Sequence, residues 1–191
     1  MRALLLTAFL LISGASFMGS PGSLAQEPAV QTNEQQARDL AQQFVGQLKP
    51  QLKQAMNKGG PRYAIEVCAR VAPSIADSLS AESGWLVKRV SLKSRNASRA
   101  QPDSWEQKVL FEFNRRQAEG EDAADIYFGE VVNGQYRYMQ AQGVEPLCLL
   151  CHGKGLSDEV ETTLDQYYPD DWATGYSLGQ VRGAISLSKK L

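Results

Sequence analysis

The chain has little cysteine, little histidine and almost no net charge. Three cysteines among 191 residues are too few for a disulfide-stapled scaffold, and their odd number leaves at least one thiol to explain. The 20 basic and 21 acidic residues nearly cancel, so the electrostatic footprint of a nucleic-acid-binding protein is missing. There is no internal repeat and no low-complexity tract. The composition, 43% hydrophobic and 21% charged, is typical of one globular domain with an appendage.

The first 25 residues have the pattern of an export signal. Arg2 precedes the apolar run of residues 3–12, and Ser23-Leu24-Ala25 has the small-x-small spacing of a cleavage site. The run is too short for a confident membrane span, although an uncleaved anchor stays open as the alternative. We therefore predict a mature chain that is soluble, free of the membrane, and periplasmic or otherwise exported into an oxidising compartment.

Two helices are predicted next: the first forms an N-terminal helical segment (26–60), and the other begins the single domain of the chain (61–191). The first helix is indicated by an apolar residue at every fourth position: Leu40, Phe44, Leu48 and Leu52. Gly59-Gly60 end it, and the following helix carries Cys68 on its apolar face. Because proline removes a helical hydrogen bond, we expect Pro50 to kink the first helix and Pro73 to bend the second.

The rest of the chain alternates between strand and helix patterns. We predict a strand over 85–92, a helix capped by Asp103 with Glu106, a hairpin turning at Asn133-Gly134, a short helix over 157–166 and a strand over 183–187. A hairpin implies antiparallel pairing, so the expected fold class is α+β.

Cys148, Cys151 and His152 form the Cys-x-x-Cys-His signature of c-type haem attachment. The two thiols add across the vinyl groups of the porphyrin, and their three-residue offset lets both sulfurs reach one side of the ring. The adjacent imidazole is then placed as the proximal iron ligand. Covalent attachment takes place outside the cytoplasm, which agrees with the export signal. We predict one covalent haem c.

Two other uses of these residues remain open. A redox dithiol normally accompanies a βαβ pattern, which the chain lacks. A zinc site would add Cys68 to the set, but the adjacent Cys151 and His152 would chelate one ion awkwardly.

The second axial ligand cannot be another histidine of the chain, because there is only one. The soft candidates are Cys68, then Met139, and last Met56, which is expected to be filler. A thiolate favours ferric iron and lowers the potential, whereas a thioether raises it. Cys68 is the thiol left to explain, but a free cysteine is also ordinary as a small buried apolar residue.

Five stretches carry a family resemblance from residue 59 to the C-terminus: GGPRYAIEVCARVAPSIADSLS, VKRVSLKSRN, QPDSWE, PLCLLCHG and YYPDDWATGYSLGQVRGAISL. On these the chain resembles the exported, single-haem, c-type PAS-like haem-sensor family, once catalogued as a domain of unknown function. The family implies a PAS-like antiparallel sheet flanked by helices, with the haem bound against it. It also implies a His/Cys axial pair, in which His152 matches the proximal ligand and Cys68 the distal one. The family often continues Arg-Asn into proline, whereas here Arg95-Asn96 runs into Ala97.

Basic and aromatic residues near these motifs are further candidates. Arg89 and Arg95 are expected to pair with haem propionates or to hold Cys68 as a thiolate, with solvated charges as the equal alternative. The same alternatives apply to Arg182. The candidate haem walls, for which plain core is the commoner role, are Tyr168, Trp172 and Tyr176.

Two functions follow from this chemistry. A sensor of redox state or of a diatomic gas would act through a signalling partner, because the chain carries no kinase or other output module. The alternative is a low-potential periplasmic electron carrier with its own redox partner. An enzyme is not expected, because two protein ligands leave no open position on the iron.

Overall fold

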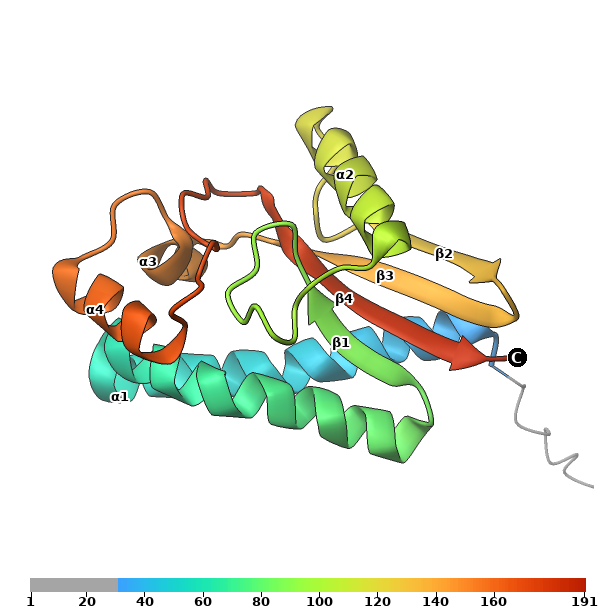
Figure 1. Cartoon of the computed structure of the whole chain (residues 1–191), viewed down its shortest axis with the longest axis horizontal. Helices are drawn as coiled ribbons and strands as arrows, with labels where there is room; N and C mark the ends of the chain where they lie inside the picture. The colour runs from blue at the N-terminus through green and yellow to red at the C-terminus, as the bar shows by residue number, and fades with distance from the viewer. Residues whose placement is uncertain (1–30) are drawn as a thin grey trace, which may run out of the picture. The chain divides into compact units, whose positions relative to one another are not determined.

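The computed structural model describes residues 31–191, and within them a four-stranded antiparallel sheet is packed between helices (Figure 1). The predicted export signal lies outside these residues. The elements are α1 (Asn33–Ser83), β1 (Leu86–Val90), α2 (Ser104–Ala118), β2 (Tyr127–Val132), β3 (Gln135–Gly143), a 3-10 turn η1 (Pro146–Cys148), α3 (Leu149–His152), α4 (Asp158–Tyr167) and β4 (Val181–Lys190). The strand order β1-β4-β3-β2, antiparallel throughout, confirms the predicted α+β class. No helix within residues 31–191 is both long and apolar enough to cross a membrane.

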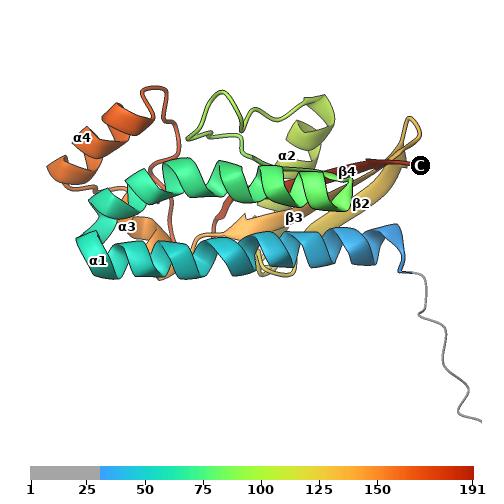
Figure 2. The same cartoon turned by 90° about the horizontal axis from the view of Figure 1, so that it is seen from below.

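Helix α1 is a hairpin of two arms, the first arm over 33–58 and the second arm over 61–83, which lie side by side (Figure 2). The chain reverses at Gly59 and Gly60, and Gly60 has φ +65° and ψ −163°, a conformation that favours glycine. These are the only residues of α1 with non-helical angles, so both arms stay helical through Pro50 and Pro73, and the kink and the bend expected there stay predictions. Pro50 is exposed, and water can hydrate the Gly46 carbonyl that it leaves unpaired.

The two arms cover one face of the sheet, and α2 covers the other. Side chains of neighbouring strand residues point to opposite faces. Val87 and Tyr138 therefore pack against the arms, whereas Val90 and Met139 pack against α2 with Phe113. The sheet is buried on both sides, and its strands supply the centre of both cores.

Several local predictions are confirmed. Asp103 and Glu106 form a complete capping box at the start of α2. Asn133 and Gly134 both have positive φ, as the tight hairpin turn between β2 and β3 requires. The last strand, β4, is longer than predicted and lies between β1 and β3 at the middle of the sheet.

Helices α3 and α4 lie beyond one end of the sheet, where β1 and β3 end and β4 begins (Figure 1). Helix α4 packs on the second arm through Val160 and Leu164 against Ile65. This end of the molecule holds the candidate site.

Candidate functional site

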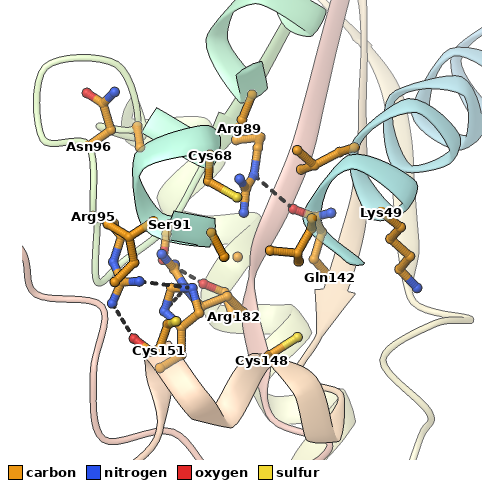
Figure 3. A pocket seen from close by; sticks show the side chains of 18 of the residues that line it. Lys49, Cys68, Arg89, Ser91, Arg95, Asn96, Gln142, Cys148, Cys151 and Arg182 are labelled. Atoms are coloured by element: carbon orange, nitrogen blue, oxygen red, sulfur yellow. Dashed lines mark hydrogen bonds between the residues drawn. The ribbon is translucent and has the colours of Figure 1, made fainter. Parts of the chain in front are cut away.

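A cavity of about 240 Å³ lies between the two arms, the end of the sheet and the segment that contains α3. It is lined by all four of the predicted haem-binding side chains, Cys68, Cys148, Cys151 and His152. Figure 3 shows Cys68 on the other side of the cavity from Cys148 and Cys151, which lie on the short helical segment below it. The structure therefore brings together residues that are about 80 positions apart in the sequence.

The two arms supply the apolar wall and the lone cysteine. Leu48, Leu52 and Met56 share one face of the first arm because they are spaced by four residues. Cys68 faces them from the second arm, one turn away from Ala72. The reversal at Gly59-Gly60 is what turns these two apolar faces toward one cavity.

The two cysteines that are predicted to attach haem are three residues apart across η1 and α3, so both lie on one side of this segment. We call residues 146–153 the attachment segment after that prediction. Gly153 ends α3, and its N–H donates to the Leu149 carbonyl at 2.9 Å. A Cβ at residue 153 would lie 2.5 Å from that carbonyl oxygen, so a larger residue cannot occupy the position without movement of the backbone. The glycine after the histidine is thus part of the local geometry.

The loop after α4 holds His152 in place. The Nδ1–H of His152 donates to the Ala173 carbonyl at 2.6 Å, and the Tyr176 N–H donates to the His152 carbonyl at 2.9 Å. The Gly175 N–H also donates to the Gly153 carbonyl at 2.8 Å. The attachment segment is therefore bonded to a second segment some 20 residues later in the chain.

The imidazole of His152 is in the form that binds metals. Burial lowers its pKa well below the usual range, and the nearby charges of Arg182 and Arg95 lower it further. Because the Ala173 carbonyl can only accept, the single ring proton of the neutral imidazole is on Nδ1. Nε2 carries the lone pair and lies 3.5 Å from Arg95 Nη1, a long contact in which the guanidinium can donate to it. This tautomer is typical of a histidine ligand anchored by a backbone carbonyl.

Four arginines line the cavity, Arg89, Arg95, Arg99 and Arg182, and they do not all bond to the protein in the same way. Arg95 forms an ion pair with Asp171 at 3.0 Å and donates to the carbonyls of Cys151 and Ala173. Its side chain is 11% exposed and that of Asp171 is 9% exposed, so the pair is a nearly buried clamp on the attachment segment. Most of its donors are occupied.

Arg89 is less engaged. Within residues 31–191 its one hydrogen bond to the protein runs from Nε to the Gln142 side chain at 3.2 Å, and it has no carboxylate partner there. Burial lowers its pKa, an effect that the Cys68 sulfur opposes. Of the two arginines predicted to meet a propionate, Arg89 therefore has the donors to spare.

Burial also acts on the thiols. It raises the pKa of Cys68, and the charges of Arg89 and Arg95 oppose the shift without cancelling it. The arginines therefore act in the predicted direction but do not by themselves hold Cys68 as a thiolate. Burial raises the pKa of Cys151 to about 11.

The fold places some of the remaining candidate ligands and haem walls at the cavity and others away from it. Met139 is fully buried against α2, on the face of the sheet away from the cavity, whereas Met56 lines the cavity. The sequence ranking of the two methionines is therefore reversed by position. Tyr168 lines the cavity, and Tyr176 meets the His152 ring edge-on at 6.4 Å. Trp172 is 71% exposed and is not a wall.

Three functional contacts were not foreseen from the sequence: Asp171, the Ala173 carbonyl and Gln142. The first two lie in the stretch YPDDWATGY, whose unusual density of aspartate and aromatic residues was the available signal. The two other uses of the cysteines gain no support. The three thiols form no disulfide, and among residues 31–191 no three His, Cys, Asp or Glu side chains are placed to hold a metal ion together.

Comparison with known proteins gives two matches. The model of the family described as Tll0287-like matches residues 25–189. The crystal structure of the cyanobacterial heme-protein Tll0287 superposes with a TM-score of 0.60 over 81% of this chain and 91% of that one, at 23% sequence identity. The superposition supports the fold described above. No curated protein matches the chain.

Proposed function

The chain belongs to the Tll0287-like family, and from this we propose that it is an exported c-type haem protein that senses redox state or a diatomic gas. One haem is attached through Cys148 and Cys151, with His152 and Cys68 as the axial ligands. The observation that carries the proposal is that these four side chains line one cavity. The solved relative is described as a heme-protein, which supports the choice of cofactor.

The residues around the cavity suit a haem. Leu48, Leu52 and Ala72 offer an apolar wall for a porphyrin face, and Arg89 with Gln142 offers polar groups for a carboxylate edge. Haem supplies, when bound, an iron centre that exchanges one electron and binds small diatomic molecules. Holding this group and orienting its ligand atoms would be the work of the protein's side chains.

His152 and Cys68 have complementary roles. His152 is kept neutral by burial and oriented by the Ala173 carbonyl, so that Nε2 is the ligand atom. Cys68 is a protonated thiol when alone, since burial raises its pKa. Cys68 would lose this proton on binding iron, and as a thiolate it would favour the ferric state.

The position of Cys68 favours a sensor. It lies on the second arm, which packs on the sheet through Ile75 and Leu79 and turns at Gly84 into β1. Arg89, on β1, lies close enough for the Cys68 sulfur to shift its pKa. A change at the Cys68 ligand would therefore reach both an arm and a strand, which a partner protein could detect.

A low-potential electron carrier is the second candidate. Leu150 lies between the two attachment cysteines and is 47% exposed, so the attachment segment reaches the surface. A surface position next to the cofactor is what exchange of electrons with a redox partner requires.

The test uses chain expressed in an export- and maturation-competent host. We expect a haem stain to persist on a denaturing gel and to be lost in the Cys148→Ser/Cys151→Ser double variant. Colourless wild-type protein would refute the assignment. Carbon monoxide or nitric oxide added to the reduced protein should shift the Soret band if the function is sensing, whereas an unchanged spectrum would favour the electron carrier.

A further inference from the structure

Arg182 is a half-buried cation placed directly beside the ring of His152. Its Nε lies 3.2 Å from His152 Nδ1. That nitrogen already donates its proton to Ala173 at 2.6 Å, so it cannot also accept from Arg182. The guanidinium therefore acts on the imidazole as a neighbouring positive charge rather than as a hydrogen-bond partner.

The guanidinium is fixed by groups of the chain. Its Nη1 donates to the Ser91 hydroxyl at 2.9 Å and to the Lys93 carbonyl at 3.1 Å. Ser91 Oγ also lies 2.7 Å from the Arg182 carbonyl. The next residue, Gly183, has φ +157°, and a Cβ there would lie 2.4 Å from the Val90 carbonyl oxygen. β1 and β4 thus approach closely enough to keep Ser91 and Arg182 together.

The charge of Arg182 is uncompensated. Arg95, the other guanidinium close to the imidazole, is paired with Asp171. Arg182 forms no ion pair with any carboxylate among residues 31–191, and apart from its contact with His152 it bonds there to one hydroxyl and one backbone carbonyl. Burial lowers its pKa to about 10, which still leaves it charged at neutral pH. A full charge 3.2 Å from the ring acts on the imidazole mainly because it is so close.

We propose that Arg182 is a positioning residue that tunes the iron through His152, raising the reduction potential that the Cys68 thiolate lowers. The inference rests on the proposed function. A positive charge beside the imidazole disfavours the extra positive charge of ferric iron and weakens electron donation by the ligand. The two sides of the site would then act in opposite directions on the same couple.

The test measures the midpoint potential of matured protein by optical titration. In Arg182→Gln, which removes the charge, the equilibrium should move at least tenfold toward ferric iron, a fall of 59 mV or more for one electron. Arg182→Lys keeps the charge, so its equilibrium between ferric and ferrous iron should stay within a few-fold of that of wild type. Lys108→Gln is the matched control, because Lys108 is an exposed cation on α2 that does not line the cavity. Its potential should be unchanged.

The possible results separate the Arg182 proposal from the proposed function. An unchanged potential in Arg182→Gln overturns the proposal, and so does an equal fall in Arg182→Lys, which would mean that shape rather than charge matters. If Arg182→Gln does not mature, Ser91→Ala replaces it. Loss of the Nη1 acceptor frees the guanidinium, and the redox equilibrium should move a few-fold toward ferric iron. An unmoved potential in Ser91→Ala would then count against the proposal. Wild-type protein without covalent haem would instead refute the proposed function itself.

Discussion

The Nδ1–H of His152 donates a hydrogen bond to the carbonyl oxygen of Ala173, at 2.6 Å. This bond joins the attachment segment to a loop 21 residues later and fixes both the tautomer and the direction of the imidazole. The loop adds backbone bonds from Gly175 and Tyr176 to the same segment. The position of the His152 ring is therefore set mainly by backbone groups, which no side-chain substitution in the loop removes directly.

Cys68→Ala tests the distal ligand. The variant should mature normally but lose thiolate-type low-spin signals from the EPR spectrum of the ferric protein, and its potential should rise because the anionic ligand is gone. Met56→Leu is the control, because Met56 lines the same cavity and leucine is close to it in volume. Thiolate signals that persist in Cys68→Ala would show that the ligand is assigned to the wrong residue. If they vanish in Met56→Leu as well, their loss reports a disturbed cavity and not the removal of a ligand.

Asp171→Asn tests the clamp formed with Arg95. Both side chains are nearly buried, so removal of the carboxylate charge leaves a guanidinium with poor compensation. We expect a loss of about 2–3 kcal/mol in the free energy of unfolding, measured by urea denaturation. Arg70→Gln removes an exposed helical ion pair with Glu66 and should stay close to wild type.

A double variant separates the contribution of the Arg95–Asp171 ion pair from that of the other bonds made by Arg95. If Arg95 and Asp171 stabilise the fold mainly through each other, Arg95→Gln/Asp171→Asn should cost less than the sum of the two single changes. Additive losses would mean instead that the bonds from Arg95 to the backbone carbonyls of Cys151 and Ala173 carry the effect.

The sequence was a good guide where structure is determined locally. The capping box of Asp103 and the Asn133-Gly134 turn depend on residues within a few positions of one another, and both were predicted correctly. The attachment motif is local in the same sense: its cysteines are one helical turn apart. Such features need no knowledge of the rest of the fold.

Features that depend on long-range register were not predictable. Met139 and Tyr138 are adjacent and both apolar, so the sequence alone cannot say which faces α2 and which faces the arms. The bonds from His152 to Ala173 and from Arg95 to Asp171 join segments that only the folded chain brings together. The four haem-binding candidates do converge on one cavity, while haem attachment and ligation stay predictions.

Asp103 is expected to make stability depend on pH. Burial raises its pKa, but hydrogen bonds from Arg137 and from the Glu106 N–H outweigh that effect, so the pKa is lowered overall. A carboxyl with a lowered folded pKa stabilises the protein above its unfolded pKa, and this stabilisation is lost as pH falls through the folded value. The free energy of unfolding should therefore decline as the pH falls below the unfolded pKa of Asp103 and through its lower, folded pKa.

Two substitutions at Asp103 separate its charge from its capping role. Asp103→Asn keeps a good helix cap, so its stability at neutral pH should fall only modestly and should decline less in acid than that of wild type. Asp103→Ala removes the cap as well and should cost about 1 kcal/mol more. Equal urea midpoints for the two variants across the pH series would contradict the capping role.

Gly153→Ala tests whether the glycine after the haem-binding histidine is required by the backbone. A Cβ at residue 153 would lie 2.5 Å from the Leu149 carbonyl oxygen, which accepts the hydrogen bond that closes α3. The chain must then shift next to His152, and we expect less covalent haem per protein and a lower unfolding midpoint. Gly155→Ala is the matched control, because a Cβ at residue 155 has no heavy atom within 4 Å. Haem content is measured from the absorbance of the pyridine complex against total protein. Equal haem content in the two variants would show that α3 can relax around a side chain, and that the glycine is not what sets the direction of the imidazole.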